Sequence, residues 1–594
     1  MRDAWRRTRL ASAFELFAIS FRSHPWWTAL LFASGVGDAL VAPLSAALTG
    51  LVVSIVVDGG PASRLVTPLI AYAVLQGHPI GELRWRLSDT LGNRIGDVLD
   101  ERVTRAYLDP PGIAHLDDPS VRDAADRAAS FWNSSILEGA LSVLVSRGTG
   151  IAGAVLLGLS AGWPVAVVVT CGWLVVSRRA WAASKKALDV QFEQSPELRD
   201  SQYAVEMGVD PAVAKDVRVF GLPSWLLDRH TRLWRSALAP VWRQRRCDVA
   251  PNVALGVAIG ALNGGALAWI GYAALRGSIS PGALTVAVQA LLQVGGLGRM
   301  PYGSWEMEYG LRAVPANREL LALVGEERFT LRGSLPADGL PSREIRFQGV
   351  AFAYPGRDVD VLAGVDLVIP AGSSLAIVGA NGAGKTTLLK LLCRFLDPTA
   401  GSITVDGVLL ADVDPVAWHA RIGGLFQDFV RYPLSARDNV VADDTLPLDV
   451  ARRAAERAGI LDVIEALDEG WSTPLTRRFV GGTDLSGGQW QRVALARALA
   501  AIDVGAGLLV LDEPTAHLDA KAEADLYDRF LELTAGVTTV LISHRFSTVR
   551  RAEHIAVLDG GRITEFGTHD ELVARRGTYA AMFAVQADRF VSER

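Results

Sequence analysis

Cysteine is scarce in this sequence, and the few cysteines lack the patterns of a disulfide-stabilised or a zinc-binding protein. Only Cys171, Cys247 and Cys393 occur in 594 residues. They are odd in number and far apart, with neither a C-x-x-C pair nor the Cys/His spacing of a zinc site. We therefore expect three inert thiols and no disulfide framework.

A strong excess of charge is missing as well. The formal net charge is −5 over 594 residues, which is too small to attract a polyanion, so nucleic acid is not an expected partner. No small-residue cleavage site follows the first apolar segment, and we therefore expect no removable signal peptide.

Apolar residues, in contrast, make up 50% of the chain, and the mean hydropathy is +0.24. A chain of 594 residues is too long for one core, so at least two domains are expected. Residues 1–24 mix five arginines with apolar side chains, a pattern typical of a basic amphipathic helix on a membrane surface. The excess of arginine over lysine and the abundant alanine are typical of a GC-rich bacterial genome.

Six longer apolar segments follow. A helix needs roughly 20 apolar residues to cross a hydrocarbon core about 30 Å thick. The predicted spans are residues 26–57, residues 65–81 with kinks at Pro68 and Pro79, residues 139–177 divided into two spans by a turn at 158–164, residues 249–275, and residues 277–298.

The charged segments all fall on one side of these spans. They are the arginine-rich N-terminus, residues 82–138, residues 178–248 and everything after Arg299. The positive-inside rule makes this side cytoplasmic. We expect a membrane domain in residues 1–324, a turn-rich linker in residues 325–343 and a second domain of the α/β class in residues 344–594.

Residues 379–386 read Gly-Ala-Asn-Gly-Ala-Gly-Lys-Thr and match the phosphate-loop pattern G-x-x-x-x-G-K-[ST] at every fixed position. An apolar, strand-like run precedes the loop and a helix-like run follows it. Backbone N–H groups and the helix dipole then face the phosphates. We expect Lys385 to reach the β- and γ-phosphates of a nucleotide and Thr386 to offer its hydroxyl to Mg²⁺.

Three further signals follow the loop in order. Residues 485–489 read Leu-Ser-Gly-Gly-Gln, and residues 508–513 form an apolar strand that ends in Asp512 and Glu513. Asp512 can hold Mg²⁺, and Glu513 can orient or deprotonate an attacking water. His544 follows another apolar strand, residues 539–542.

With these motifs in this order, the chain resembles the ATP-binding cassette (ABC) family, whose signature is the Leu-Ser-Gly-Gly-Gln element. The cassette resemblance covers residues 344–584, and the spans before it resemble the transmembrane half of exporter-type ABC proteins. The resemblance implies a membrane α-helical domain of six transmembrane helices, followed by an α/β P-loop ATPase domain, fused in one half-transporter.

The resemblance also implies roles for individual residues, with ATP and Mg²⁺ as cofactors. The implied catalytic residues are Glu513 as the base, His544 as the switch histidine near the γ-phosphate, and Gln427, which senses magnesium and contacts the membrane domain. The implied ATP-binding residues are Tyr354, which stacks on adenine, and Gly379, Ala380, Asn381, Gly382, Ala383, Gly384, Lys385, Thr386, Thr387, Ser486, Gly487, Gly488, Gln489 and Asp519. The implied magnesium ligands are Thr386, Gln427 and Asp512.

In this family the signature of one cassette faces the phosphate loop of another, so one cassette cannot complete a site. The resemblance therefore implies a second half-transporter, in a homodimer or a heterodimer. The chain departs from the family at Arg477, where many exporters have glutamate, and at Ala516-His517, which replaces the common Ser-Ala. The departure at Arg477 leaves open how the cassette is coupled to the membrane domain. The resemblance implies that residues 111–120 and 210–220 form the contacts between the membrane domain and the cassettes.

Polar residues inside the predicted spans have two interpretations each. Asp38 is the one acidic residue in a span, so it either serves transport, or it pairs with Arg147 or lies in a wet cavity. Gln289 and Gln293, four residues apart on one helical face, either line a cavity or form hydrogen bonds between helices.

These features predict ATP-driven export of an amphipathic small molecule, lipid or peptide by alternating access across a bacterial plasma membrane. Importer activity on the same scaffold and an ATP-gated channel or regulator are the alternatives. The six apolar segments argue against a soluble cassette ATPase acting in DNA repair or translation. The sequence does not specify the transported substrate.

Overall fold

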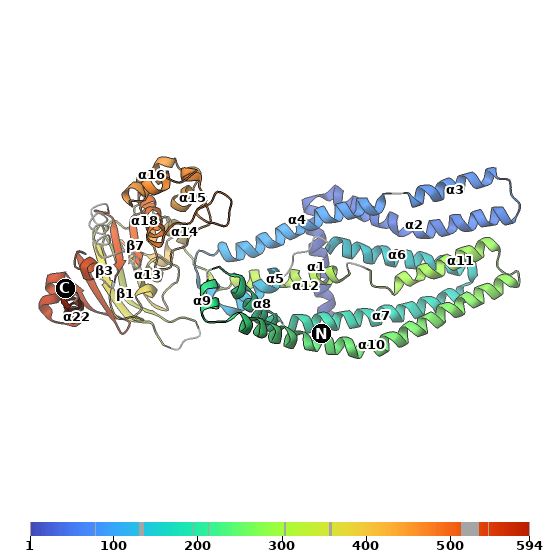
Figure 1. The fold of residues 1–594 in the computed structure, drawn as a ribbon, viewed down its shortest axis with the longest axis horizontal. Coiled ribbons are helices and arrows are strands. Elements are labelled where there is room, and N and C mark those ends of the chain that lie inside the picture. Colours follow the sequence, from blue (N-terminus) through green and yellow to red (C-terminus); the bar gives the residue numbers. More distant parts are fainter. Residues whose placement is uncertain are drawn as a thin grey trace. The chain divides into compact units, whose positions relative to one another are not determined.

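The computed structural model describes residues 2–77, 79–129, 136–193, 195–211, 213–301, 304–355, 359–512, 534–543 and 546–592. By its internal contacts the chain divides into two compact units. The first comprises residues 1–104 and 124–320, and the second comprises residues 105–123 and 321–594. The first unit is helical, and the second combines helices with two sheets (Figure 1).

The helices of the first unit and its borders are α1 (Arg2–Ser23), α2 (Pro25–Val57), α3 (Ser63–Gln76), α4 (Ile80–Leu108), α5 (Pro119–Ala129), α6 (Ile136–Ala161), α7 (Trp163–Glu193), α8 (Ser195–Val209), α9 (Ala214–Val219), α10 (Pro223–Leu275), α11 (Pro281–Val294), η2 (Gly295–Leu297) and α12 (Ser304–Val324). Among the described residues, four helices are long and apolar enough to cross a membrane: α2, α6, α7 and α10.

All six predicted apolar segments fall on helices, but the second and sixth are shorter than predicted. The helices α3 and α11 have 14 residues each, which corresponds to about 21 Å. The helix α3 ends at Gln76 because Gly77 and Pro79 follow, and proline cannot continue the backbone hydrogen bonds of a helix.

The predicted turn at residues 158–164 is much shorter in the structure. The helix α6 continues to Ala161 and α7 begins at Trp163, so Gly162 alone separates them, with a φ of +99°. Glycine adopts this left-handed conformation without the steric cost that a Cβ brings. A Cβ at Gly158 would lie 2.6 Å from the ring of Trp163, so the two helices pack tightly at the turn.

The N-terminal segment is helical, as predicted, and α1 packs on the other helices of its unit. Leu16 and Ile19 of α1 are buried in one cluster with Leu91 and Ile95 of α4. The hydroxyl groups of Ser20 and Thr28 lie 2.9 Å apart and link α1 to α2. Part of the apolar surface of α1 therefore meets protein, whereas Phe14 and Phe21 are 72% and 48% exposed. The position of α1 at a membrane surface stays a prediction.

The second unit contains ten strands among its described residues: β1 (Glu344–Phe352), β2 (Leu362–Pro370), β3 (Ser374–Val378), β4 (Ala400–Val405), β5 (Val408–Leu409), β6 (Ile422–Leu425), β7 (Leu508–Asp512), β8 (Thr538–Ile542), β9 (His554–Asp559) and β10 (Arg562–Gly567). They form a four-stranded sheet, β2-β1-β4-β5, and a six-stranded sheet, β10-β9-β3-β8-β7-β6. In the larger sheet β9, β3, β8, β7 and β6 are parallel.

The helices of the second unit include η1 (Ala114–Asp117), η3 (Glu327–Phe329), α13 (Lys385–Leu392), η4 (Leu410–Asp412), α14 (Pro415–His419), α15 (Ala436–Val440), α16 (Leu448–Arg457), α17 (Leu461–Glu465), η5 (Gly470–Ser472), α18 (Gly487–Asp503), α20 (Phe546–Val549), α21 (His569–Arg575) and α22 (Thr578–Ser592).

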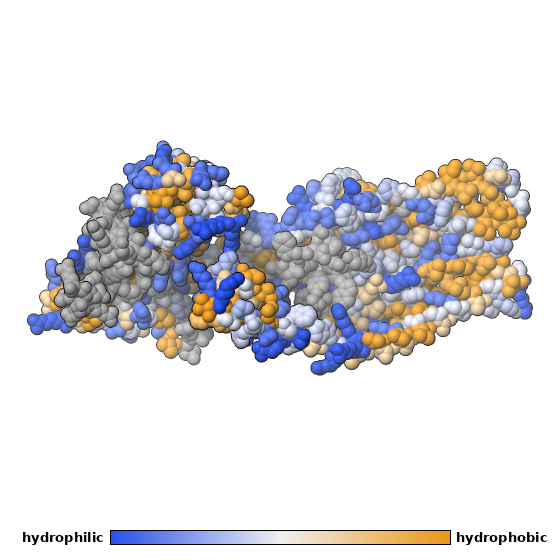
Figure 2. All heavy atoms as spheres, in the orientation of Figure 1, coloured by the Kyte–Doolittle hydropathy of each residue, from blue (hydrophilic) through white to orange (hydrophobic). Residues whose placement is uncertain are grey.

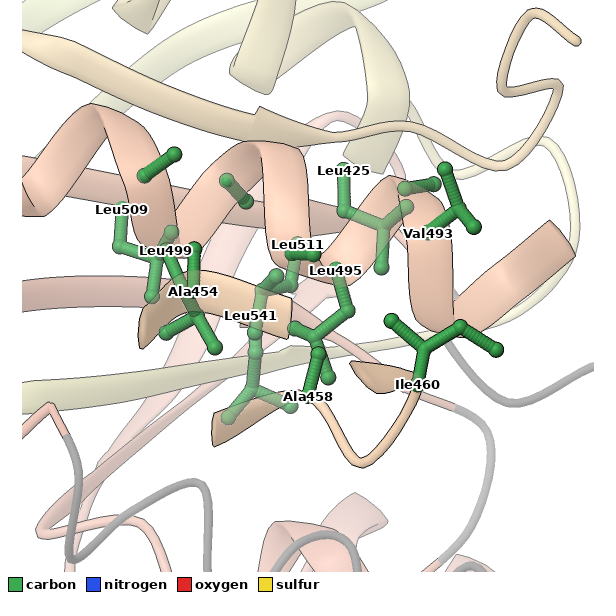
Figure 3. Packing of buried hydrophobic residues seen from close by; sticks show 14 of the residues in the cluster. Leu425, Ala454, Ala458, Ile460, Val493, Leu495, Leu499, Leu509, Leu511 and Leu541 are labelled. Atoms are coloured by element: carbon green, nitrogen blue, oxygen red, sulfur yellow. The ribbon is translucent and has the colours of Figure 1, made fainter. Parts of the chain in front are cut away.

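The helices α13 and α18 pack against opposite faces of the six-stranded sheet. Successive strand side chains point to opposite faces. Leu508 and Val510 of β7 share a buried cluster with Leu388 of α13. Leu509 and Leu511 belong to the cluster that contains Leu495 and Leu499 of α18 (Figure 3).

The three cysteines form no disulfide, as predicted. Cys393 is buried directly after α13, and burial raises the pKa of its thiol to about 12. This thiol therefore stays protonated and unreactive near neutral pH. Cys171 and Cys247 are exposed.

Candidate functional site

The phosphate loop lies between β3 and α13, as the sequence predicts. The strand β3 is buried along its whole length, and α13 begins at Lys385. Gly384 has a φ of +102°, and a Cβ there would lie 2.8 Å from a methyl carbon of Leu362. A larger residue would therefore strain the loop, so glycine at this position lets the backbone N–H groups turn toward an anion.

Lys385 is folded over the loop that it follows. Its side chain is buried, and its Nζ donates to the carbonyl oxygens of Gly379 and Ala380 at 2.8 and 2.9 Å. The ammonium group thus lies among the backbone of residues 379–384, where a bound phosphate would meet it. This arrangement supports the role predicted for Lys385.

Thr386 and Asp512 lie together although 126 residues separate them. The Oγ1 of Thr386 donates to the Oδ2 of Asp512 at 3.1 Å, and the Asp512 side chain is 2% exposed. A hydroxyl and a carboxylate are hard oxygen ligands, and Mg²⁺ is usually bound by one or two protein groups together with water and substrate phosphates. The pair therefore fits a magnesium ion beside the phosphate loop.

The edge of the sheet explains how these residues meet. The parallel strands β3, β6, β7 and β8 all end at the same edge, where α/β sheets commonly bind ligands. Leu425 of β6 pairs with Leu511 of β7, so Gln427, two residues farther on, lies at the edge that holds Asp512. Its side chain is exposed, consistent with a group that would approach a bound ligand.

Tyr354 lies beside the first turn of α13. Its hydroxyl is 3.2 Å from the Oγ1 of Thr387, and the ammonium of Lys390 lies 5.7 Å from its ring centroid. The ring is half-buried against the cluster that contains Phe352. The structure thus places this aromatic side chain near the phosphate loop, which supports the predicted adenine contact.

Three predicted site residues, Glu513, Asp519 and His544, lie outside the described residues. Their neighbours are described: β7 ends at Asp512, directly before Glu513, and Ser543 after β8 is buried.

The Leu-Ser-Gly-Gly-Gln element begins α18. Ser486 is the N-cap: its Oγ accepts from the backbone N–H of Gln489 at 3.3 Å, while the Oε1 of Gln489 accepts from the backbone N–H of Ser486 at 2.8 Å. This reciprocal capping box orients the start of the helix. The Gln489 side chain thus serves the cap, whereas a Cβ at Gly487 would meet nothing within 4 Å, which leaves the helix N-terminus open to an anion.

Sequence analysis did not find the hydrogen bond that supports this helix start. The Nε1 of Trp490, whose side chain is 1% exposed, donates to the Oδ1 of Asp484 at 2.9 Å. The bond ties the residue before Leu485 to the first turn of α18. An aromatic residue directly after a signature motif is the sequence signal that points to it.

Replacing Trp490 by phenylalanine should slow ATP hydrolysis about 3- to 10-fold and raise the KM for ATP, because one hydrogen bond that orients Ser486 is worth about 1 kcal/mol. Steady-state kinetics measure both constants. Trp418→Phe is the matched control, because Trp418 is also buried and donates to the carbonyl of Leu392, away from α18. Equal KM values for the two variants would contradict the assigned role.

Residues 111–120, where coupling contacts are expected, pack on the cassette within the second unit. The backbone N–H of Ile113 donates to the carbonyl of Phe395 at 3.0 Å, and Arg328 forms an ion pair with Asp118 at 2.7 Å. The ring of Phe395 lies 5.9 Å from that of Phe426, next to Gln427, and 5.2 Å from that of His419. Burial lowers the pKa of His419, which keeps this ring neutral near pH 7.

The second expected coupling segment, residues 210–220, contains α9 in the first unit. Val219 and Phe220 at its end are 79% and 71% exposed. Arg477, the departure from the family pattern, is exposed too. The residues that 210–220 and Arg477 contact in an assembled transporter stay a prediction.

The membrane-domain aspartate has a partner that differs from the predicted one. Asp38 of α2 forms an ion pair with Arg84 of α4, and Arg84 also binds Glu138 of α6 at 2.9 Å. Arg147 instead points to the carbonyl of Gly296, with its Nη1 3.5 Å from the oxygen. The predicted Asp38–Arg147 pair is therefore wrong. The first turns of α4 place Arg84 beside Asp38, and Arg84 forms the ion pair instead.

The two glutamines of α11 form hydrogen bonds between helices, which is one of the two predicted roles. The Nε2 of Gln289 donates to the hydroxyl of Thr49 at 3.1 Å, and the Nε2 of Gln293 donates to the carbonyl of Ala42 at 2.9 Å. Both partners belong to α2. These bonds hold α11 against α2 in an apolar surrounding, where such bonds favour association of helices.

Comparison with known proteins agrees with this arrangement. The ABC transporter family profile matches residues 362–516. The chain is 34% identical over 434 residues, 72% of this chain and 70% of the relative, to the ATP-dependent lipid A-core flippase of Alkalilimnicola ehrlichii. A protein of the same name from Methylococcus capsulatus is 34% identical over 344 residues, and the match spans 56% of each chain, little more than half of that relative.

A solved structure, that of a bacterial Atm1-family ABC exporter with ATP bound, covers 96% of this chain and 99% of its own, with a TM-score of 0.73 and 25% sequence identity. Fold, phosphate loop and signature thus define an ATP-binding cassette protein, and the chain belongs to the ABC transporter family. Within that family it is an exporter-type half-transporter, in which the membrane helices and the ATPase domain are fused in one chain.

Proposed function

We propose that this protein exports an amphipathic small molecule, lipid or peptide by ATP-driven alternating access, working as a dimer. The observation that carries the proposal is the packing of α13 and α18 on opposite faces of one sheet. The phosphate loop and the signature of one chain thus start from different sides of the domain. A second half-transporter supplies the missing signature for each phosphate loop.

Each site residue is assigned a part in this mechanism. Lys385 and the N–H groups of residues 379–384 bind the phosphates, and Thr386 and Asp512 would hold a Mg²⁺ ion, which would neutralise phosphate charge. Ser486, with the N-terminal N–H groups of α18, contacts the γ-phosphate bound to the partner. Glu513 orients and deprotonates the attacking water, and His544 contacts the γ-phosphate.

The relatives named as lipid A-core flippases are bacterial proteins, which supports an amphipathic cargo and a bacterial inner membrane with the ATPase domain in the cytoplasm. The contacts of residues 111–118 with Phe395, beside Phe426 and Gln427, support transmission of the nucleotide state to the long helix α4.

The experiment that tests the proposal measures ATP hydrolysis by the purified full chain in lipid nanodiscs. We expect saturable hydrolysis that requires Mg²⁺ and that candidate amphiphiles stimulate. ATP binding without hydrolysis by this chain alone would indicate a heterodimer with a different half. A folded chain that binds no ATP would contradict the proposal.

A further inference from the structure

One side chain of the N-terminal helix α1 joins two long helices of the first unit. The Nη1 of Arg102 on α4 donates to the Oε1 of Glu15 at 2.7 Å, and the Nε of Arg318 on α12 lies 2.9 Å from its Oε2. Each carboxylate oxygen thus binds one arginine, and the two arginines belong to different helices. We call these three residues the Glu15 bridge.

The packing of α1 holds the Glu15 carboxylate in place. Leu16 and Ile19, which follow Glu15 on the same helix, are buried in one cluster with Leu99 of α4 and Val314 of α12. These are the two helices that supply the arginines. The position of α1 is therefore set by apolar contacts with both helices, and the ion pairs form on a helix that is already fixed.

Glu15 also separates two like charges. Both guanidinium groups contact the same carboxylate, so the positive charges of Arg102 and Arg318 lie close together. Next to them, the Nδ2 of Asn317 on α12 donates to the carbonyl of Leu99 on α4 at 3.2 Å, so the two helices are in direct contact here. Without the carboxylate, the two arginines would repel each other at this contact.

The Glu15 bridge lies where the chain leaves the membrane domain. The first unit ends at Thr104 on α4 and at Leu320 on α12, two residues after Arg102 and Arg318 respectively. Both helices continue past these points without a break. In Figure 2 hydrophobic side chains gather over α2 and α3, whereas hydrophilic side chains are common around α4.

The segments that follow the two helices meet again inside the second unit. Asp118 and His115 come after α4, and Arg328 and Phe329 come after α12. Arg328 forms an ion pair with Asp118 at 2.7 Å, and the rings of His115 and Phe329 lie 6.5 Å apart. The two connections are thus joined on both sides of the border between the units.

We propose that Glu15 is a positioning residue for the transport cycle. It holds α4 to α12 where both leave the membrane domain, so that residues 109–118 and the linker move together when the cassette changes its nucleotide state. The inference rests on the proposed ATP-driven cycle and adds to it a residue of α1, far in sequence from every nucleotide-binding motif. A contiguous set of ion pairs and packed side chains is the usual carrier of such coupling.

The test measures the distance between nitroxide labels on α4 and α12 in the full chain in nanodiscs. Labels at Thr104→Cys and Ala322→Cys, both exposed positions, are placed in a chain whose native cysteines are replaced and which is diluted with unlabelled chain. We expect one narrow distance distribution that ATP does not change. Glu15→Ala should broaden it about twofold, because two unscreened guanidinium groups then repel each other.

The double variant Glu15→Ala/Arg318→Ala should narrow the distribution again, because it removes the repulsion together with the tie. Loss of packing alone would give no such rescue. The matched control is Glu82→Gln, since Glu82 pairs with Arg86 on the same helix and joins no second one. Its distribution should match that of the unlabelled-site parent.

Steady-state kinetics supply the second measurement. Glu15→Ala should lower kcat for ATP about three- to tenfold, the usual range for single residues that carry coupling, and leave the KM for ATP unchanged. Equal distributions for Glu15→Ala and Glu82→Gln would overturn the proposal, as would a distance in the unmodified chain that changes with ATP. If the chain bound no ATP, the proposed function would fail, whereas the distances without nucleotide would still decide the role of Glu15.

Discussion

Lys385→Ala should abolish ATP hydrolysis by this protein, with a loss of at least about 100-fold. The Lys385 ammonium lies within hydrogen-bond distance of the carbonyl oxygens of Gly379 and Ala380, inside the loop that is to hold the phosphates. Alanine removes this cation and leaves the loop glycines unchanged. Phosphate release measured in nanodiscs, together with binding of a fluorescent ATP analogue, checks the prediction.

Lys390→Ala is the matched control, because Lys390 lies five residues farther along α13 and contacts the ring of Tyr354 instead of the loop. We expect its activity to fall only a few-fold. Hydrolysis by Lys385→Ala at more than half the original rate would contradict the phosphate-binding role.

Glu513→Gln should also stop hydrolysis, again by about 100-fold or more, but it should leave ATP binding intact. Glutamine keeps the size of the side chain and cannot accept a proton from water. Asp512, directly before it at the end of β7, stays in place to hold Mg²⁺ with Thr386. Trapped, unhydrolysed ATP measured after rapid gel filtration would distinguish this variant from Lys385→Ala.

The control for this prediction is Glu553→Gln, which changes an exposed glutamate near β9 in the same unit. It should hydrolyse ATP at the original rate. If Glu513→Gln turned over ATP as fast as this control, another residue would have to serve as the base.

The order of motifs along the chain predicted much of the nucleotide site. A buried apolar strand, a glycine-rich loop and a helix are all local features, and the structure places them at β3, residues 379–384 and α13. Thr386 and Asp512 were each expected to bind Mg²⁺, and the structure brings their side chains within hydrogen-bond distance at the ends of parallel strands.

The contacts that sequence analysis missed depend on how helices meet. Arg84 binds Asp38 and Glu138, which are 46 and 54 residues away, and only the packing of α2, α4 and α6 decides that choice over Arg147. The helix α3 is short because a proline follows it. The turn between α6 and α7 is reduced to Gly162, where Gly158 packs against Trp163. Hydropathy predicts that apolar segments exist but does not determine the residues at which their helices begin and end.

The central claim is that an ATP site combines the phosphate loop of one chain with the signature of another. The most direct test places cysteines at Asn381 and Ser486 in a Glu513→Gln chain whose native cysteines are replaced, and measures disulfide formation between chains with and without ATP. Our account predicts a covalent dimer that forms with ATP and is absent when Lys385 is also replaced by alanine. A disulfide confined to single chains, or a yield between chains that ATP does not change, would contradict it.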